Sequence, residues 1–185
     1  MFADHTLTPK EASRLCALGA LALKPMSYAE LATAIRHFIS RVVGPTPEIM
    51  GHSIELLKYE GLIEAPAASG EEEPLRLTEA GREAMRALLM ANIRANSSEL
   101  KKLVIALKFR FLHLLPPEDQ RLQVLLLGDA TEREIARLSD LKAHHAEDEG
   151  YLPVWLDQDI AALQARLAWL QDFGRRIADV PPAAA

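Results

Sequence analysis

Two stretches decide the fold of this chain: TPEIMGHSIELLKYEGLIE, residues 46–64, and LRLTEAGREAM, residues 75–85. In the first stretch, Thr46 followed by proline is a typical helix start, because proline suits the first helical position. Gly61 is expected to end that helix, since glycine adopts the left-handed backbone that often follows a last turn. Three apolar residues at helical spacing give the helix a buried side. They are Met50, Ile54 and Leu57.

A two-stranded hairpin is predicted directly after this helix. Leu62–Glu64 reads as a short strand, and residues 75–77 read as the returning strand. The intervening segment 65–74, APAASGEEEP, is rich in small and acidic residues and is expected to be a loop. Thr78 then begins a further helix.

Two more helices precede the deciding stretch, and each begins with a capping box. Thr8 with Glu11 predicts a helix running to about residue 23, and Ser27 with Glu30 predicts the next. Three short helices followed by a hairpin are typical of the winged-helix plan. The sequence therefore predicts a mainly α fold that begins with a winged helix-turn-helix carrying a two-stranded wing.

The remainder of the chain has only helical patterns. We predict a first domain over residues 1–95 and a helical domain over residues 96–180. Gly128 is expected to interrupt the second of its helices. The predicted helices span about 99–115, 117–127, 131–149 and 154–177.

The overall charge does not favour a nucleic-acid partner. The formal net charge is −5, whereas proteins that bind nucleic acids usually carry a basic face. Residues 1–95 hold 10 Lys and Arg against 12 Asp and Glu, and residues 96–185 hold 11 against 14. Any positive surface must therefore come from the local arrangement of basic residues and from the pairing of two protomers.

Several classes of protein find no support in the sequence. The single cysteine, Cys16, is expected to be a buried apolar residue. His144 and His145 lie near acidic residues, but each helix face would hold only two ligands, so no metal site is predicted. Motifs of nucleotide-binding or hydrolytic enzymes are absent, so we expect no enzyme activity and no cofactor. Without a signal peptide or an apolar run of membrane length, a cytoplasmic location is expected, with no membrane partner.

Longer segments of the chain resemble the PadR-like transcription regulators, and in particular their AphA-like branch. The resemblance covers nearly the whole chain and implies an N-terminal winged helix that binds DNA, followed by a helical dimerisation domain. Leu-Thr-x-x-Gly-Arg at residues 77–82 and Phe-Leu-His-Leu-Leu-Pro at 111–116 are its most specific parts. The other matching segments are CALGALALKPMSYAELATAI (16–35), TPEIMGHSIELLKYEGLIE (46–64) and ALQARLAWLQ (162–171).

The resemblance makes the helix of residues 46–61 the candidate recognition helix. Such a helix lies in the major groove and presents its exposed residues to base edges. The sequence departs from the family pattern at Gly51, where a tyrosine is usual, and at His52 and Glu55, where basic residues are usual. The loop of the wing also carries three glutamates, residues 71–73. The candidate DNA-binding residues are Arg36, Arg41, Thr46, His52, Lys58 and Arg76.

The later helices are expected to form a homodimer interface. A helix that is apolar on several faces must be buried on several faces, and a partner protomer would provide that cover. The alternative is that these side chains pack within a monomeric bundle. The candidate dimerisation residues are Leu103, Leu107, Phe111, Leu114, Trp155, Leu163, Leu167, Trp169 and Leu170.

The predicted function is that of a dimeric PadR-like transcription regulator binding a pseudo-palindromic site in double-stranded DNA. By the same resemblance, a small-molecule effector could bind and change the spacing of the two wings. The first alternative is a winged-helix protein-interaction scaffold without sequence-specific DNA binding, which the acidic wing together with Glu48 and Glu55 motivates. A second is a small-molecule sensor that acts through a protein partner.

Overall fold

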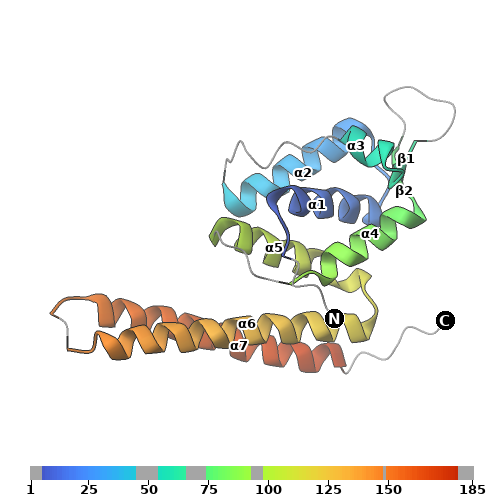
Figure 1. Ribbon diagram of the computed structural model, residues 1–185. Coiled ribbons are helices and arrows are strands. Elements are labelled where there is room, and N and C mark those ends of the chain that lie inside the picture. Colours follow the sequence, from blue (N-terminus) through green and yellow to red (C-terminus); the bar gives the residue numbers. More distant parts are fainter. Residues whose placement is uncertain (1–5, 45–53, 66–73, 93–97, 148, 179–185) are drawn as a thin grey trace. The chain divides into compact units, whose positions relative to one another are not determined.

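The computed structural model describes residues 6–44, 54–65, 74–92, 98–147 and 149–178. The chain divides into two compact units, Met1–Leu115 and Pro116–Ala185. The first contains helices α1 to α5 and a two-stranded sheet, and the second contains the long helices α6 and α7 (Figure 1). The predicted fold class, mainly helical with an N-terminal winged helix, is confirmed.

The first unit follows the predicted order of elements. Its capping boxes at Thr8 and Ser27 are both present, so the starts of the first two helices are where the sequence placed them. Its elements are α1 (Pro9–Leu23), α2 (Tyr28–Val43), α3 (Ile54–Tyr59), β1 (Ile63–Glu64), β2 (Arg76–Leu77), α4 (Glu79–Met90), α5 (Ser98–Phe111) and the short 3-10 helix η2 (Leu112–Leu114).

Helix α1 is the centre of the first unit. Between Ala12 and Leu21 nearly every residue is buried, and many of them are small. Helices α2, α4 and α5 and strand β2 all contact α1, as Figure 1 shows. Small side chains let these elements approach closely, which explains a core built mostly from leucine and alanine with few aromatic residues.

Helix α5 belongs to the first compact unit, so the unit ends 20 residues beyond the expected boundary at residue 95. The ring of Phe111 packs on Gly19 of α1 so closely that a Cβ on Gly19 would lie 2.5 Å from it. The guanidinium of Arg110 stacks over Phe38 of α2, 4.3 Å from the ring centroid. The sequence has only helical patterns beyond residue 95, but contacts with the first unit continue to the end of α5.

A buried lysine joins α5 to α4. The side chain of Lys108 is almost completely buried, and its Nζ donates a hydrogen bond to the carbonyl of Leu89 in the last turn of α4. Carbonyls at a helix C-terminus lack partners within the helix and carry partial negative charge, so an ammonium group is a favourable partner there. Burial lowers the pKa of Lys108 to about 8.

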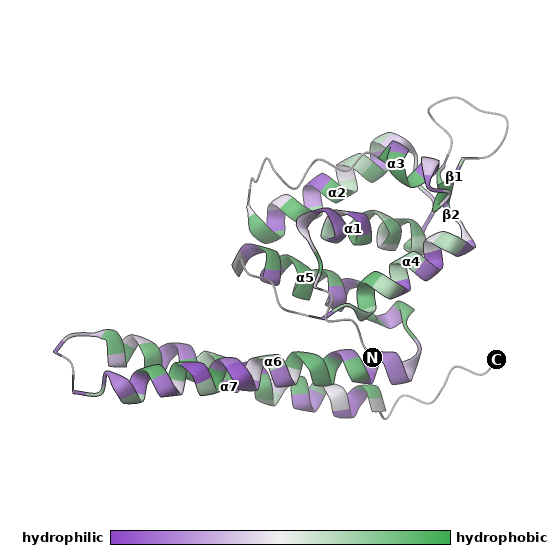
Figure 2. Ribbon diagram, in the orientation of Figure 1, coloured by the Kyte–Doolittle hydropathy of each residue, from purple (hydrophilic) through white to green (hydrophobic). Residues whose placement is uncertain are grey.

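The second unit is an antiparallel pair of helices, α6 (Pro117–His144) and α7 (Leu152–Ala178), packed along their length (Figure 1). Toward the turn that joins them, a small core forms from Leu138, Leu156 and Ile160. Figure 2 shows hydrophobic and hydrophilic residues mixed along both helices. Two helices cover each other on one side only, so several large apolar residues in the described part stay exposed.

The break predicted at Gly128 is wrong. Helix α6 runs without interruption from Pro117 to His144. An isolated glycine reduces helix stability but does not end a helix, and the packing of α6 on α7 supports it here. A Cβ on Gly128 would lie 3.9 Å from Leu167 of α7, an ordinary contact distance.

Candidate nucleic-acid interface

Helix α3 contributes the described part of the candidate recognition helix. Ile54 and Leu57 are buried, and Glu55 and Lys58 are exposed. The Lys58 Nζ lies 3.8 Å from a carboxylate oxygen of Glu55, one turn earlier. Such an exposed pair contributes little to stability, but it offsets part of the positive charge that Lys58 would bring to a phosphate.

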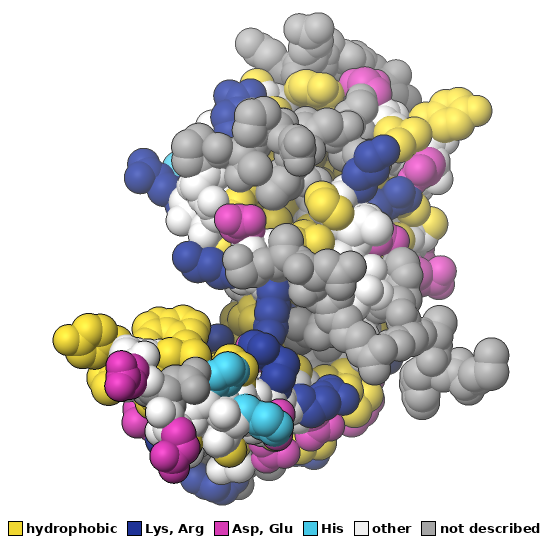
Figure 3. All heavy atoms as spheres, turned by 60° about the vertical axis from the view of Figure 1, so that its left-hand side comes forward, with side chains coloured by type: hydrophobic (Ala, Val, Ile, Leu, Met, Phe, Trp, Pro, Cys, Tyr) yellow, Lys and Arg dark blue, Asp and Glu magenta, His cyan; other side chains and the backbone are white. Residues whose placement is uncertain are grey.

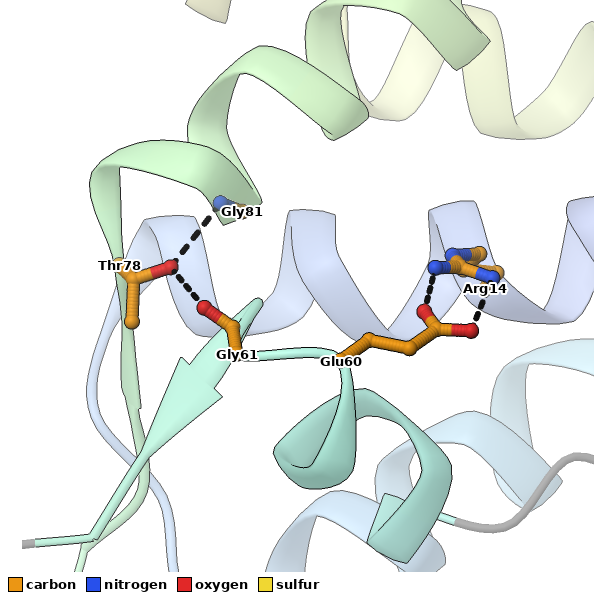
Figure 4. Close-up of polar contacts among 5 residues, drawn as sticks. All are labelled: Arg14, Glu60, Gly61, Thr78 and Gly81. Atoms are coloured by element: carbon orange, nitrogen blue, oxygen red, sulfur yellow. Dashed lines mark hydrogen bonds and ion pairs between the residues drawn. The ribbon is translucent and has the colours of Figure 1, made fainter.

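The end of α3 is fixed by its backbone and by one ion pair. Gly61 has a φ of 70°, in the left-handed region, and its amide bonds to the Lys58 carbonyl at 2.9 Å. The next amide, of Leu62, bonds back to the Leu57 carbonyl, which completes a Schellman ending. Glu60 pairs through both carboxylate oxygens with Arg14 of α1 (Figure 4). Helix α3 is therefore held against the central helix of the unit.

The wing is the β1–β2 hairpin, and it is widened by a third segment. Ile63 lies opposite Leu77, and Glu64 lies opposite Arg76. Met26, in the connection between α1 and α2, exchanges two backbone hydrogen bonds with Leu75, at 2.7 and 3.3 Å. The wing therefore rests on the connection between the first two helices.

Arg76 is exposed on the wing directly across from exposed Glu64. Cross-strand neighbours lie about 5 Å apart at Cβ, so the two side chains can interact. As with Lys58, an acidic neighbour accompanies a candidate phosphate contact. The glutamates at residues 71–73 lie outside the described residues.

The Leu-Thr-x-x-Gly-Arg segment joins the wing to α4 (Figure 4). The Thr78 hydroxyl accepts a hydrogen bond from the Gly81 amide at 3.0 Å and donates one to the Gly61 carbonyl at 2.7 Å. A Cβ on Gly81 would lie 2.0 Å from the carbonyl oxygen of Leu62. That oxygen also accepts a hydrogen bond from the Thr78 amide. This segment therefore closes a polar junction between the end of α3, the wing and the start of α4.

Arg36 and Arg41 are exposed on α2 but do not share a face. Five residues along an α-helix correspond to a rotation of about 140°. Phe38 contacts Arg110 of α5, so the α5 side of α2 is known, and Arg41 lies nearer to that side than Arg36 does. The two arginines are thus separate candidate contacts rather than one basic patch.

The remaining predicted DNA-binding residues, Thr46 and His52, lie outside the described residues, as do Gly51 and the start of the helix. For the described candidates, Arg36, Arg41, Lys58 and Arg76, the structure establishes exposure and neighbours. Their role in DNA binding stays a prediction.

The candidate dimerisation residues fall into two groups. Leu103, Leu107 and Phe111 are completely buried within one chain, so their burial needs no partner.

In the helical hairpin, Trp155 is 55% exposed and Trp169 is 45% exposed. Trp169 stacks on Phe173 with ring centroids 5.3 Å apart. In the first unit Leu114 is half-buried; in the hairpin Leu163 and Leu167 are half-buried and Leu170 is buried.

The two histidines near the hairpin turn make local contacts. His144 Nδ1 lies 3.0 Å from the Asp140 backbone carbonyl and 3.6 Å from its carboxylate. Among the residues that the structure describes, no group of three or more histidine, cysteine or acidic side chains is arranged to hold a metal ion.

Two basic residues that anchor the fold were missed at the sequence level: Lys108 and Arg110. Lys108 follows Val104 by four residues and precedes Phe111 by three, which places it in the buried stripe of α5. That spacing was the available signal. Cys16 is buried as predicted, and burial raises the pKa of its thiol to about 11, while the nearby charge of Arg110 lowers it.

The chain resembles known proteins both in sequence and in fold. A family model described as "Putative AphA-like transcriptional regulator" matches residues 2–174. The chain belongs to this family, and its class is that of transcriptional regulators. The resemblance to the AphA-like branch inferred from the sequence is confirmed. No curated protein matches the chain.

Two solved structures are similar to the chain over most of its length. One is smu.1604c from Streptococcus mutans UA159, with 15% identity and a TM-score of 0.35, covering 86% of this chain and 96% of that one. The other is Bacillus subtilis PadR in complex with operator DNA, also with 15% identity and a TM-score of 0.35, covering 89% and 98%. No helix in the described part of this chain is long and apolar enough to span a membrane.

Proposed function

We propose that this protein is a dimeric transcriptional regulator that binds a pseudo-palindromic DNA site through its winged helix. The match of the family model to residues 2–174 carries the proposal. The geometry supports it: α3 ends in a fixed Schellman turn, the wing is tied to α4, and basic side chains around them are exposed. The solved PadR structure contains operator DNA.

The positive groups available to the duplex are few. Lys58 has Glu55 beside it, and Arg76 has Glu64 across the wing. Affinity would therefore come from a small number of phosphate contacts per protomer, doubled by dimerisation. With few phosphate contacts in each protomer, the affinity for DNA falls only weakly with salt for one protomer. Tight binding therefore needs both half-sites of the DNA to be occupied.

Dimerisation is proposed to use the hairpin rather than α5. The residues of α5 that were candidates are already covered within one chain, whereas both tryptophans of the hairpin are about half exposed. Large aromatic residues are common anchors of protein interfaces. Light scattering should give twice the 20.4 kDa of one chain, and a monomer mass at micromolar concentration would contradict the dimer.

The experiment for DNA binding is fluorescence anisotropy with the DNA upstream of the protein's own gene and with a random duplex, each at two salt concentrations. We expect tighter binding to the first, with an affinity that falls as salt rises. Arg76→Ala should weaken binding to both duplexes. Arg137→Ala is the matched control, because Arg137 is an exposed arginine of the second unit paired with Glu134. No binding at low salt would contradict the proposal.

A second candidate function is a winged-helix protein-interaction scaffold. The observation that favours it is the exposure of large apolar side chains on α3. Tyr59 is 90% exposed beside Lys58 and Glu55, and Leu56 is also exposed. If the protein binds neither the upstream DNA nor the random duplex at low salt, the scaffold function is favoured over DNA binding.

A further inference from the structure

At the junction of α1, α2 and α5, one nitrogen of a charged group lacks an acceptor within the described chain. The Nη1 atom of Arg110 is buried, and it has no hydrogen-bond partner among the described residues. Several other described arginines have carboxylate partners, for example Arg14 with Glu60 and Arg82 with Glu79. Within the described chain, no ion pair reaches Arg110.

Aromatic rings hold the Arg110 guanidinium in place. Its central carbon lies 4.3 Å from the centroid of the Phe38 ring and 5.0 Å from that of Phe111. Phe111 in turn packs directly on Gly19. A cation over an aromatic face is stabilised by the ring, but the ring accepts no hydrogen bond from the edge of the guanidinium. The N–H groups at that edge remain available to an acceptor in the plane.

The positive charge of Arg110 is felt inside this junction. The Cys16 thiol of α1 is buried, and Arg110 lowers its pKa against the larger effect of burial. No described acidic side chain pairs with Arg110, and its Nη1 donor is buried without an acceptor among the described residues. An unsatisfied buried donor is unfavourable, and one small negatively charged acceptor would satisfy it.

We propose that a small monovalent anion, of the class of chloride or formate, binds at Nη1 of Arg110, where the guanidinium of α5 lies over Phe38 of α2. The anion is small because Nη1 is buried, and it is monovalent because one guanidinium supplies the charge. The Arg110 side chain as a whole is only half-buried, so a small local opening gives access from solvent. Occupancy would stabilise the first unit in an anion-specific way that does not depend on DNA binding.

The test is thermal unfolding at constant ionic strength in potassium chloride, potassium formate or potassium gluconate, gluconate being too large to enter. Anions also act on protein stability in general, so the readout is the difference between the wild type and Arg110→Met. The wild type should gain a saturable rise of the midpoint in chloride or formate, about 5 °C at ten times the dissociation constant. Arg110→Met should lose this rise.

Lys102→Met is the matched control, because Lys102 is an exposed cation on the same helix. This variant should keep the anion-specific rise. Equal responses of the wild type and Arg110→Met, or a loss of the rise in Lys102→Met as well, would overturn the proposal.

A second measurement uses only the wild-type protein, in case Arg110→Met does not fold. Crystals grown in bromide should show an anomalous peak within hydrogen-bond distance of Arg110 Nη1. A water molecule on Nη1 in bromide, without an anomalous peak, would show that water satisfies the donor and would overturn the proposal.

Discussion

Replacing Lys108 with methionine should remove a pH-dependent contribution to the stability of the first unit. Lys108 is buried in α5, donates to the Leu89 carbonyl, and has a pKa of about 8 in the folded state against an ordinary value of 10.5. Its protonated form is therefore disfavoured by folding. Methionine keeps the length and the apolar stem but carries no charge.

The sign and size of the effect follow from these two pKa values. Between about pH 8 and pH 10.5 the unfolded chain holds the Lys108 proton and the folded chain does not, so the free energy of unfolding rises with pH. Below that window both states are protonated, and the buried charge costs about 3 kcal/mol relative to a neutral amine. Raising the pH from 7 to 9.5 should recover about 2 kcal/mol.

The assay is urea unfolding of the wild type and of Lys108→Met at pH 7 and pH 9.5. Other groups that titrate in this range, including Cys16, are present in both proteins and cancel in the comparison. The variant leaves the Leu89 carbonyl without its donor, at a cost on the order of 1 kcal/mol. It should therefore be at least as stable as the wild type at pH 7, and the wild type should gain about 2 kcal/mol on the variant by pH 9.5.

The two units can be followed separately in this experiment. Both tryptophans, Trp155 and Trp169, lie in the second unit, so tryptophan fluorescence reports on the helical hairpin and circular dichroism on all helices. The Lys108 effect should appear in the circular dichroism transition of the first unit. If the wild type and the variant respond equally to pH, the charge of Lys108 is not desolvated and the reasoning fails.

Two further substitutions and one labelling experiment test other parts of the structure. Gly81→Ala should destabilise the first unit by at least about 2 kcal/mol, because the added Cβ meets the Leu62 carbonyl; urea unfolding checks this, and a neutral effect would mean that the junction is looser than described. Gly128→Ala should stabilise the hairpin by about 0.5–1 kcal/mol, since helix propensity improves and the contact with Leu167 stays ordinary; a lower midpoint by tryptophan fluorescence would contradict it. Cys16 should resist alkylation at pH 8 in the native protein and react in urea, since burial holds its thiol protonated; rapid native labelling would contradict this.

Local sequence signals predicted the elements of the first unit well. The capping boxes at Thr8 and Ser27, the glycine at residue 61 and the threonine at residue 78 each act over three or four residues, so a single sequence contains the whole signal. The resemblance to the PadR-like family predicted the same winged-helix elements. For the same reason, the predicted wing strands coincide with β1 and β2 to within one residue.

Contacts between distant segments were not predictable in this way. The pairing of Arg14 with Glu60, the seat of Lys108 on α4 and the stacking of Arg110 on Phe38 join residues that are far apart in the chain. The break expected at Gly128 failed because tertiary packing outweighs a local preference of about 1 kcal/mol. The described candidate phosphate contacts are exposed. The acidic neighbour of Arg76, Glu64 on the opposite strand, emerged only from the fold.

The contact of Phe111 with Gly19 has a practical consequence for anyone dividing this protein into fragments. A fragment that stops near residue 95, the boundary expected from the sequence, would leave an uncovered apolar strip along α1 and would be prone to aggregate. A fragment that continues through Leu115 would include the whole first compact unit and carry its own cover, so it is the better fragment for isolating that unit.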